Sequence, residues 1–466
     1  MNKKAHDISV NKSSSPGGNN LKWEAIYFIG IGGVGMSAIA RYFLSNGKKV
    51  AGFDKTATTI TNSLEELGAE IHFEDAVSNI PASFLEVKNT LVVYTPAISK
   101  NHNELNYFEQ HEFKVLKRAA ILGEITRNTF CLAVAGTHGK TTATSMLGHI
   151  MQPSKATSFL GGIAENYNSN LILGDAEISV VEADEFDRSF LHLSPNIACV
   201  TSMDADHLDI YGESEALEKA FVDFSEKVSD TLIVAKGLPL KGLTYAIDEA
   251  ADYRAFHVRV ESGKYIFDVQ TPSETIQNIE LSLPGRHNVM NALAALAMAD
   301  VYGVSLECVK ESLRTFKGVQ RRFSYKIKAE DLVLIDDYAH HPTEINAVIN
   351  SVREMYPAEK VLGIFQPHLF SRTRDFVDDF ATSLAQFDEL LLLDIYPARE
   401  MPIQGVSSSW LLEKIDLEYK KIISEKEVLI NIKKSSAKIV IMMGAGDIGV
   451  LVNSLVKELK ITKRST

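Results

Sequence analysis

Hydrophobic runs along the chain alternate with longer segments of helical spacing, in an order that predicts strands followed by helices. The first run, Ala25 to Ile29, leads through a glycine-rich turn into a helical stretch from Met36 to Ser45. Val50 to Phe53 and Thr90 to Tyr94 are further strand-like runs. Central strands of a parallel sheet are buried on both faces, so they read as continuous apolar runs. The pattern therefore predicts a parallel, doubly wound sheet at this end of the chain.

The same order of elements begins again near residue 129. A strand from Phe130 to Ala135 is followed by a glycine-rich loop and by a helix that Pro153 stops. The runs Ile178 to Val181 and Ile197 to Thr201 predict two more central strands, and each ends in a polar cluster, EADEFD and SMDADH. Ligands of open α/β sheets gather at the carboxyl ends of strands, so these clusters mark a candidate site.

A third block of alternating elements begins near Gly318. Its apolar runs predict four strands, at Leu332 to Ile335, Val361 to Phe365, Leu390 to Leu393 and Ile439 to Met442. The segments between them have helical spacing. The chain therefore divides into three α/β blocks, which is consistent with its length of 466 residues.

Composition narrows the class of protein. The net charge of −12 argues against a general nucleic-acid binder, which usually carries a basic stripe. No apolar run approaches about 18 residues, so we expect no membrane span. The N-terminal segment lacks the apolar stretch of a signal peptide, and Cys131, Cys199 and Cys308 are far apart, as in reduced cytoplasmic proteins. Residues 1–22 are rich in Ser, Gly and Asn, which predicts a disordered tail.

A candidate phosphate-binding loop follows the first strand of the second block. It consists of Gly136, Thr137, His138, Gly139, Lys140, Thr141 and Thr142. Backbone N–H groups at a helix N-terminus bind phosphate, the lysine suits the β and γ phosphates, and the Thr141 hydroxyl suits Mg²⁺. The full motif has glycine where this chain has Val134, and the alternative is an ordinary glycine-rich turn. The position between strand and helix favours ATP binding.

The two polar clusters supply candidate ligands for a metal ion. Mg²⁺ prefers oxygen ligands, and EADEFD offers Glu182, Asp184, Glu185 and Asp187. Glu182 follows its strand directly and is the first choice, together with His207 from DADHLD after the next strand. For one carboxylate alone, a solvated loop or a helix cap is the commoner role. The pairing of two clusters behind a phosphate loop favours a metal site.

The first glycine turn, GIGGVG at 30–35, satisfies the dinucleotide-binding pattern, with Asp54 about 20 residues further on. An NAD-dependent oxidoreductase is therefore an alternative from another reaction class. A glycine turn before a helix also holds the pyrophosphate of other nucleotides, including a UDP-sugar. The segment at 444–449 matches the same pattern and is interpreted as a tight turn, which shows how weak the pattern is alone.

Taken together, the motifs resemble those of the Mur ligases of peptidoglycan synthesis. They are IYFIGIGGVGMSAIA, GTHGKTTATSM, VVEADEFDRSFLHL, DADHLDIYG, PGRHNVMNALAA, GVQRRF, DDYAHHPTEI, FQPHLFSRTRDFVDDF, DIYPARE and MGAGDIG. The resemblance covers about residues 23 to 450. GIGGVGMS, DDYAHHPTE, FQPH with SRTRD, and DIYPA point to the member that adds L-alanine. The relative that recycles tripeptide-bearing muropeptides shares several motifs and is the enzymatic alternative.

The resemblance implies the fold class α/β with three domains. They are an N-terminal Rossmann-like domain that binds the UDP-sugar (23–127), a central P-loop ATPase-like parallel sheet that binds ATP (128–317), and a C-terminal Rossmann-like ligase domain (318–466). It also implies the reaction. ATP phosphorylates the lactyl carboxylate of UDP-N-acetylmuramate, the amine of L-alanine attacks the acyl phosphate, and an amide, ADP and phosphate result. A cytoplasmic monomer or homodimer is expected.

The resemblance also assigns roles to individual residues. The expected metal ligands are Thr141, Glu182 and His207, and Lys140 neutralises charge during transfer. Nucleotide contacts are expected from Asn288, Asn291, Arg322 and Asp336, with Asp337 beside the last. Asn288 has an alternative role in helix capping. The UDP-sugar would be bound by Gly30, Gly32, Gly33, Gly35, Met36, Ser37 and Asp54.

Two histidines and two arginines complete the candidate site. His340 and His341 lie in a loop before a helix and titrate near neutral pH, so either suits amine deprotonation or carboxylate orientation. Arg372 and Arg374 suit the carboxylates of alanine and the sugar. Many family members have arginine where this chain has Leu369, so contacts made by that residue are in doubt. A third class, a nucleotide-binding switch without turnover, stays open.

Overall fold

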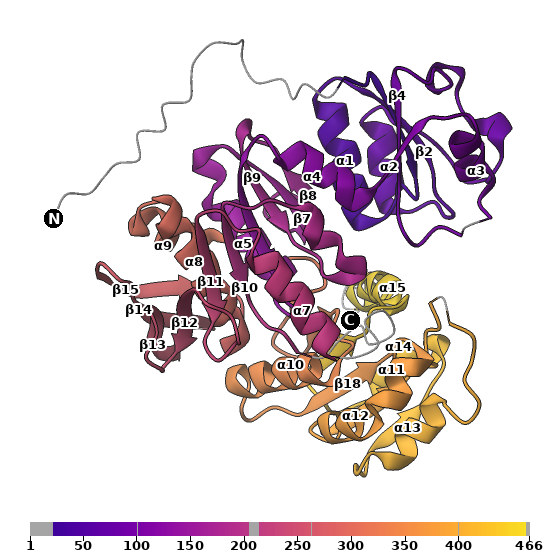
Figure 1. The fold of residues 1–466 in the computed structure, drawn as a ribbon. Coiled ribbons are helices and arrows are strands. Elements are labelled where there is room, and N and C mark those ends of the chain that lie inside the picture. Colours follow the sequence, from indigo (N-terminus) through magenta and orange to yellow (C-terminus); the bar gives the residue numbers. More distant parts are fainter. Residues whose placement is uncertain (1–21, 100, 205–213, 262, 399, 463–466) are drawn as a thin grey trace.

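The computed structural model describes residues 22–99, 101–204, 214–261, 263–398 and 400–462. The chain forms three sheets one after another, with helices packed against them (Figure 1). The N-terminal unit lies at the upper right of Figure 1, the central unit at the left and the C-terminal unit below. The predicted tail 1–22 falls almost wholly outside the described residues.

The N-terminal sheet has five parallel strands in the order β3-β2-β1-β4-β5. The strands are β1 (Ala25–Ile29), β2 (Lys49–Phe53), β3 (Glu70–His72), β4 (Thr90–Tyr94) and β5 (Lys114–Lys117). The helices are α1 (Val34–Ser45), α2 (Thr59–Glu66), α3 (Asn103–Gln110) and α4 (Arg118–Thr126), with short 3₁₀ turns at Val77–Asn79 and Ala82–Phe84. The parallel sheet expected here is confirmed, and α1 starts two residues earlier than expected.

The central sheet has ten strands in the order β15-β14-β13-β12-β11-β10-β6-β9-β7-β8. The strands are β6 (Phe130–Ala135), β7 (Ala156–Ala164), β8 (Ser169–Ile172), β9 (Asp175–Glu182), β10 (Ile197–Val200), β11 (Thr231–Ala235), β12 (Leu243–Ile247), β13 (Tyr253–Glu261), β14 (Lys264–Gln270) and β15 (Thr275–Leu281). The inner strands are parallel as expected, but both ends carry antiparallel strands that the sequence pattern did not reveal. Strand β15 alternates buried and exposed residues, so it lacks a continuous apolar run.

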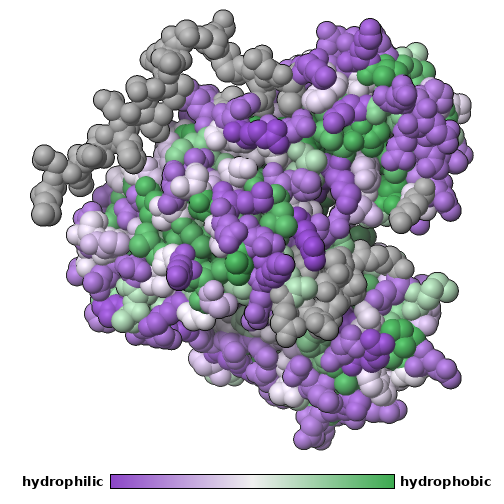
Figure 2. Space-filling view, viewed as in Figure 1, coloured by the Kyte–Doolittle hydropathy of each residue, from purple (hydrophilic) through white to green (hydrophobic). Residues whose placement is uncertain are grey.

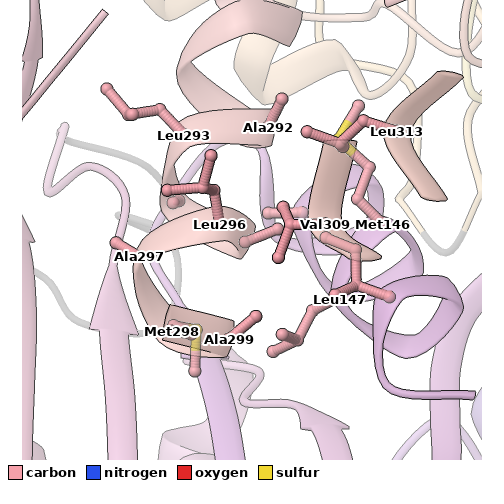
Figure 3. Close-up of a cluster of buried hydrophobic side chains, with 14 of the residues drawn as sticks. Met146, Leu147, Ala292, Leu293, Leu296, Ala297, Met298, Ala299, Val309 and Leu313 are labelled. Atoms are coloured by element: carbon pink, nitrogen blue, oxygen red, sulfur yellow. The ribbon is translucent and has the colours of Figure 1, made fainter. Parts of the chain in front are cut away.

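Three of the described helices of the central unit, α5 (Lys140–Ile150), α8 (Arg286–Tyr302) and α9 (Leu306–Thr315), share a core that supports the phosphate loop. The unit also has α7 (Ser214–Ser225) and 3₁₀ segments at Gln152–Ser154 and Phe186–His192. Met146 and Leu147 of α5 join Leu296 of α8 and Val309 of α9 in one buried cluster (Figure 3). A helix that is apolar all round, as α8 is over most of its length, belongs in a core. This packing fixes the N-terminus of α5.

The C-terminal sheet has six strands in the order β16-β17-β21-β18-β19-β20, and only β16 is antiparallel to its neighbour. The strands are β16 (Ser324–Lys328), β17 (Val333–Asp337), β18 (Val361–Phe365), β19 (Glu389–Leu392), β20 (Lys420–Ile422) and β21 (Ile439–Met443). The helices are α10 (Pro342–Met355), α11 (Phe370–Asp375), α12 (Val377–Leu384), α13 (Ser408–Lys414), α14 (Val428–Lys434) and α15 (Ile448–Thr462), and a 3₁₀ turn spans Glu425–Glu427. All four predicted strands are present.

Hydrophilic residues cover most of the visible face of the N-terminal and C-terminal units, and an open notch separates these units at the right of Figure 2. Within the described residues, no helix has the length and apolar character needed to cross a bilayer. The predicted boundaries at 127/128 and 317/318 fall between α4 and β6 and between α9 and β16. They stay predictions.

Candidate active site

The glycines of the phosphate loop adopt conformations that other residues avoid. The loop joins the carboxyl end of β6 to the N-terminus of α5. Gly136 has a φ of +133° and Gly139 a φ of +81°. A Cβ at Gly136 would lie 2.1 Å from Thr201 Oγ1, and one at Gly139 would lie 2.3 Å from Asn291 Oδ1. Both glycines are therefore needed for the loop to keep its shape.

The end of the neighbouring strand β10 supports the loop. The Thr137 N–H donates to the Ser202 carbonyl over 3.2 Å, and the His138 N–H donates to Ser202 Oγ over 2.7 Å. The Asp204 N–H donates to Thr137 Oγ1 over 3.0 Å. The polar cluster after β10 thus positions the loop directly. The sequence predicts this cluster at a strand end, but no motif indicates a role for Ser202.

Lys140 is held by a buried ion pair. Its Nζ lies 2.8 Å from both carboxylate oxygens of Glu185 and donates to the Gly136 carbonyl over 2.7 Å. Burial acts to lower the pKa of Lys140, but the carboxylates of Glu185, Asp184 and Glu182 outweigh it, so the pKa lies above its ordinary value. The lysine is therefore charged. Glu185, a candidate metal ligand in the sequence, is the partner of the loop lysine here.

Thr141 and Glu182 lie together, as a shared metal site requires. Thr141 Oγ1 donates to Glu182 Oε1 over 3.0 Å, and the Gly161 N–H donates to Glu182 Oε2 over 3.0 Å. Burial raises the pKa of Glu182, against the opposing effect of Lys140. A hydroxyl and a carboxylate are ligands that suit Mg²⁺, which takes few protein groups beside phosphate and water. His207, the third expected ligand, lies outside the described residues.

Among the residues that the structure describes, no three His, Cys, Asp or Glu side chains gather in a way that would hold a metal by themselves. The donor set at Thr141 and Glu182 therefore fits an ion whose remaining ligands come from a nucleotide and water. The prediction of Mg²⁺ stays a prediction.

Two buried amides of α8 border the loop. The Asn291 Nδ2 donates to Asn288 Oδ1 over 3.3 Å, and the Asn288 Nδ2 donates to the Pro284 carbonyl over 2.6 Å. Asn291 faces Gly139, so it lies beside the loop as a nucleotide contact would. The capping alternative for Asn288 is wrong, because Gly285 is the N-cap and no side chain caps this end of α8.

Arg322 and Glu344 meet at the junction between the central and C-terminal units. Arg322 Nη1 donates to Glu344 Oε1 over 3.3 Å, and its guanidinium lies 5.2 Å from the centre of the Tyr338 ring. Burial acts to raise the pKa of Glu344, but His340 and Arg322 hold it well below its ordinary value. The charge of Arg322 also acts to lower the pKa of Glu182. Glu344 was not among the residues predicted from the sequence.

The two adjacent histidines have different surroundings. His340 Nδ1 lies 2.9 Å from the Tyr338 carbonyl and 3.3 Å from Glu344 Oε2. Burial lowers the pKa of His340. Since both neighbours of Nδ1 are acceptors, Nδ1 carries the proton and Nε2 of the neutral ring is an acceptor. His341 is the N-cap of α10, and its ring lies 5.7 Å from that of His138 in the phosphate loop.

Asp336 and Asp337 point to opposite faces of β17, as neighbours in a strand must. Asp336 is paired with Arg321 at 3.7 Å and Lys326 at 3.8 Å. Asp337 accepts backbone N–H groups from Phe323 and Ala339, and burial raises its pKa to about 6 against the charge of Arg322. Of the two, Asp337 is the one that Arg322 influences. The nucleotide contact expected of Asp336 stays a prediction. Its carboxylate lies next to two cations of its own unit.

The arginines of α11 also differ. Arg374 Nε donates to Asp375 Oδ1 over 2.7 Å on the surface. The charge of Arg372 adds to the effect of burial in lowering the pKa of His340. Leu369, at the N-terminus of α11, has a φ of +70°, and its N–H donates to the Tyr396 carbonyl over 3.0 Å. Of the two arginines, Arg372 is the one whose charge acts on His340.

The first glycine turn is braced by its own unit. The Gly30 N–H donates to the Phe53 carbonyl over 2.8 Å, and the Gly32 N–H donates to Asp54 Oδ2 over 2.7 Å. Asp54 therefore supports the turn. Gly33 is the N-cap of α1. Met36 and Ser37, expected at the sugar site with Gly35, are buried just beyond it, and the Ser37 hydroxyl accepts from Asn170 of the central unit over 2.8 Å.

A cavity of about 180 Å³ lies between the N-terminal and central units. Its lining includes Gly35 and Arg118 from the former and Gly161, Glu182 and Asp184 from the latter. The cavity therefore connects the end of the first glycine turn with the carboxylate of Glu182. Arg118 was missed in the sequence, where the only signal is a Lys-Arg pair before a helix.

Comparisons with known proteins agree with this geometry. The UDP-N-acetylmuramate–L-alanine ligase of Flavobacterium psychrophilum is 58% identical over 438 residues, which are 93% of this chain and 98% of that protein. Three family models match consecutive segments: the Mur ligase family catalytic domain at 25–129, the Mur ligase middle domain at 134–299 and the Mur ligase glutamate ligase domain at 321–448. The chain belongs to the Mur ligase family. Mur ligases are ATP-dependent, and the chain is a ligase.

Solved Mur ligase structures share the fold. The crystal structure of the UDP-N-acetylmuramate-alanine ligase MurC of Thermotoga maritima has a TM-score of 0.81 and 28% identity, and the match covers 94% of this chain and 99% of that one. A murein peptide ligase of Psychrobacter arcticus has a TM-score of 0.68 at 22% identity, covering 94% and 98%, and shares the fold. The three-domain α/β class is confirmed, and the oxidoreductase alternative gains no support.

Proposed function

We propose that this Mur ligase joins L-alanine to the lactyl carboxylate of UDP-N-acetylmuramate at the expense of ATP, the first amino-acid addition to the peptidoglycan precursor. One observation carries the proposal. The cavity from the first glycine turn ends at Glu182, next to Thr141 and the phosphate loop. A sugar nucleotide held at the turn thus has its reactive group beside a phosphoryl donor. The 58% identity to a ligase of that name supports the choice of substrates.

The phosphate loop would bind ATP and prepare its γ phosphate. The loop N–H groups and Lys140 face the phosphates, with Asn288, Asn291 and Arg322 around the nucleotide. Thr141 and Glu182, with His207 by similarity, would hold Mg²⁺, which supplies charge neutralisation for transfer between two anions. The lactyl carboxylate oxygen attacks the γ phosphorus and the bond to ADP breaks, leaving an acyl phosphate. Phosphorylation is needed because a carboxylate is a poor electrophile.

The C-terminal unit would supply the amine. The nitrogen of L-alanine attacks the carbonyl carbon of the acyl phosphate, and the tetrahedral intermediate expels phosphate to leave an amide. The neutral ring of His340 has Nε2 available to take the proton of the ammonium group, and Glu344 and the Tyr338 carbonyl orient it. Arg372, whose charge acts on His340, suits the carboxylate of the amino acid. His341 orients the phosphate loop through His138.

The proposal also includes Mg²⁺ as the metal, the cytoplasm as the compartment and a preference for L-alanine as the amino acid. A methyl group gives only about 1–3 kcal/mol of discrimination, so glycine or serine are weak competitors that a test must include. Two of the three free cysteines, Cys131 and Cys199, are buried, which suits a reducing cytoplasm.

A coupled assay of ADP release tests the proposal. We expect release only when UDP-N-acetylmuramate, Mg²⁺ and L-alanine are all present, with L-alanine preferred over glycine and serine. A parallel reaction offers the tripeptide of the recycling pathway in place of L-alanine. Phosphate release that does not depend on the sugar nucleotide would refute the proposal, and preference for the tripeptide would favour the recycling ligase.

A further inference from the structure

We propose that Arg118 binds the lactyl carboxylate of the sugar nucleotide and positions it for phosphorylation. The inference rests on the proposed function for the identity of the substrate. It rests on the cavity between the N-terminal and central units for its geometry. No motif singled out in the sequence includes this residue.

Arg118 lies against the first glycine turn. It is the first residue of α4 and follows β5 at the carboxyl end of the N-terminal sheet. A Cβ added at Gly35 would lie 2.5 Å from Arg118 Nη1, so the guanidinium packs directly on the start of α1. The guanidinium therefore occupies the route from a pyrophosphate at the turn to the central unit.

The other end of the guanidinium reaches the acidic segment of the central unit. Arg118 Nη2 donates to Asp184 Oδ2 over 3.2 Å, two residues beyond Glu182. Both side chains are partly buried, at 22% and 35% exposure. Arg118 is thus one side chain that touches the sugar-nucleotide turn and the loop that carries the metal ligand.

The charge of the cavity calls for a cation at this point. Glu182 and Asp184 in its lining are both acidic, and Arg118 is the basic residue of the lining. A carboxylate brought next to Glu182 meets repulsion unless a cation pairs with it. Lys140 of the phosphate loop is already paired with Glu185.

Arg118 has donors to spare for such a ligand. Its side chain makes one hydrogen bond to the described part of the chain, the bond to Asp184. A guanidinium carries five N–H donors in a planar fork that matches a carboxylate. A substrate carboxylate can therefore bind at the fork in addition to Asp184 or in exchange for it.

Calorimetric titration with two nucleotide sugars separates the contribution of the lactyl carboxylate to affinity from that of the rest of the ligand. UDP-N-acetylglucosamine has the same nucleotide and sugar ring as UDP-N-acetylmuramate but lacks the lactyl group. For Arg118→Met we expect the affinity for UDP-N-acetylmuramate to fall at least about tenfold, or about 1.4 kcal/mol. The affinity for UDP-N-acetylglucosamine should change less than about twofold. Arg118→Lys keeps the charge but lacks the planar fork. Its affinity for UDP-N-acetylmuramate should lie between that of the unmodified protein and that of Arg118→Met.

Lys117→Met is the matched control. Lys117 Nζ forms a second ion pair across the same two units, to Asp187 Oδ2 at 2.8 Å, but does not line the cavity. We expect this variant to leave both affinities within about twofold, because exposed ion pairs contribute little. Equal losses for both nucleotide sugars in Arg118→Met, or no loss, would overturn the inference. So would the same selective loss in Lys117→Met.

The outcome is separable from that of the proposed function. Ligation of L-alanine by the unmodified protein is measured independently of the titrations. If it fails while Arg118→Met still loses affinity for the lactyl-bearing nucleotide alone, the proposed function is wrong and the role of Arg118 stands. If ligation succeeds and the unmodified protein binds both nucleotides equally, the role of Arg118 is wrong.

Discussion

The Nζ atom of Lys140 lies 2.8 Å from both carboxylate oxygens of Glu185, whose side chain is completely buried. The loop lysine therefore has an anionic partner inside the protein before any phosphate arrives. Breaking a buried ion pair at one side is costly, because it leaves an unpaired charge. The pair keeps Lys140 charged and near the loop in the absence of nucleotide.

Replacing Glu185 should therefore destabilise the protein in a way that nucleotide relieves. For Glu185→Gln we expect the free energy of unfolding to fall by about 3 kcal/mol without nucleotide. A non-hydrolysable ATP analogue with Mg²⁺ should narrow the difference, because phosphate replaces the lost charge. Urea unfolding of both proteins, with and without the analogue, checks this. A difference that nucleotide leaves unchanged would contradict the role given to the pair.

Replacing Lys140 itself should remove turnover. For Lys140→Ala we expect ADP release to fall by about a thousandfold or more, since a charge that stabilises phosphoryl transfer is lost. Lys155→Ala is the control, because Lys155 is 71% exposed and paired only with Asp175 on the surface. Far-ultraviolet circular dichroism should show both variants folded. Activity of Lys140→Ala close to that of the control would exclude the assigned role.

Gly139 offers a test of the loop backbone. An alanine there meets a φ of +81° and Asn291 Oδ1 at 2.3 Å, so Gly139→Ala should weaken ATP binding at least about tenfold. Gly237→Ala has a similar φ of +96° with no atom within 4 Å of its Cβ. It should cost some stability and leave ATP affinity unchanged. Equal ATP affinities in the two variants, measured by titration, would show that the contact with Asn291 is unimportant.

Features set by a short stretch of chain could be predicted from the sequence. The phosphate loop is one, because its glycines, lysine and threonine act within a single strand-to-helix connection. Glu182 is another, because it directly follows a recognisable strand. In the structure it accepts a hydrogen bond from Thr141, and the shared metal site stays a prediction. The parallel inner strands were visible for the same reason, as continuous apolar runs.

Features that depend on distant segments could not be predicted. Arg118 and Asp184 are 66 residues apart, and no pattern in either segment indicates the other. The EADEFD carboxylates look alike in sequence, yet burial beside Lys140 sets Glu185 apart from Glu182. The antiparallel strands at the ends of the central sheet were not predicted, because their exposed faces break the apolar runs.

A buried carboxyl in the N-terminal unit gives the last prediction, on pH. Glu104 of α3 is fully buried, and it accepts the Tyr27 hydroxyl over 2.7 Å and the Ala76 N–H over 3.2 Å. Burial raises its pKa from 4.5 to about 7, although both hydrogen bonds oppose the shift. His72 at 3.4 Å and Asp75 are the titratable neighbours. The folded protein therefore keeps this proton at pH values where the unfolded chain has released it.

The sign of the pH effect follows from this raised pKa. The contribution of protonated Glu104 to stability is complete below pH 4.5 and is lost as the pH rises to about 7. Its size is on the order of 3 kcal/mol. Glu104→Gln, which cannot ionise, should remove that part of the slope, so its melting temperature should fall less between pH 5 and pH 7.5. Glu109→Gln, an exposed site on the same helix, should keep the slope of the unmodified protein. Parallel pH profiles for both variants would show that Glu104 keeps its charge when buried.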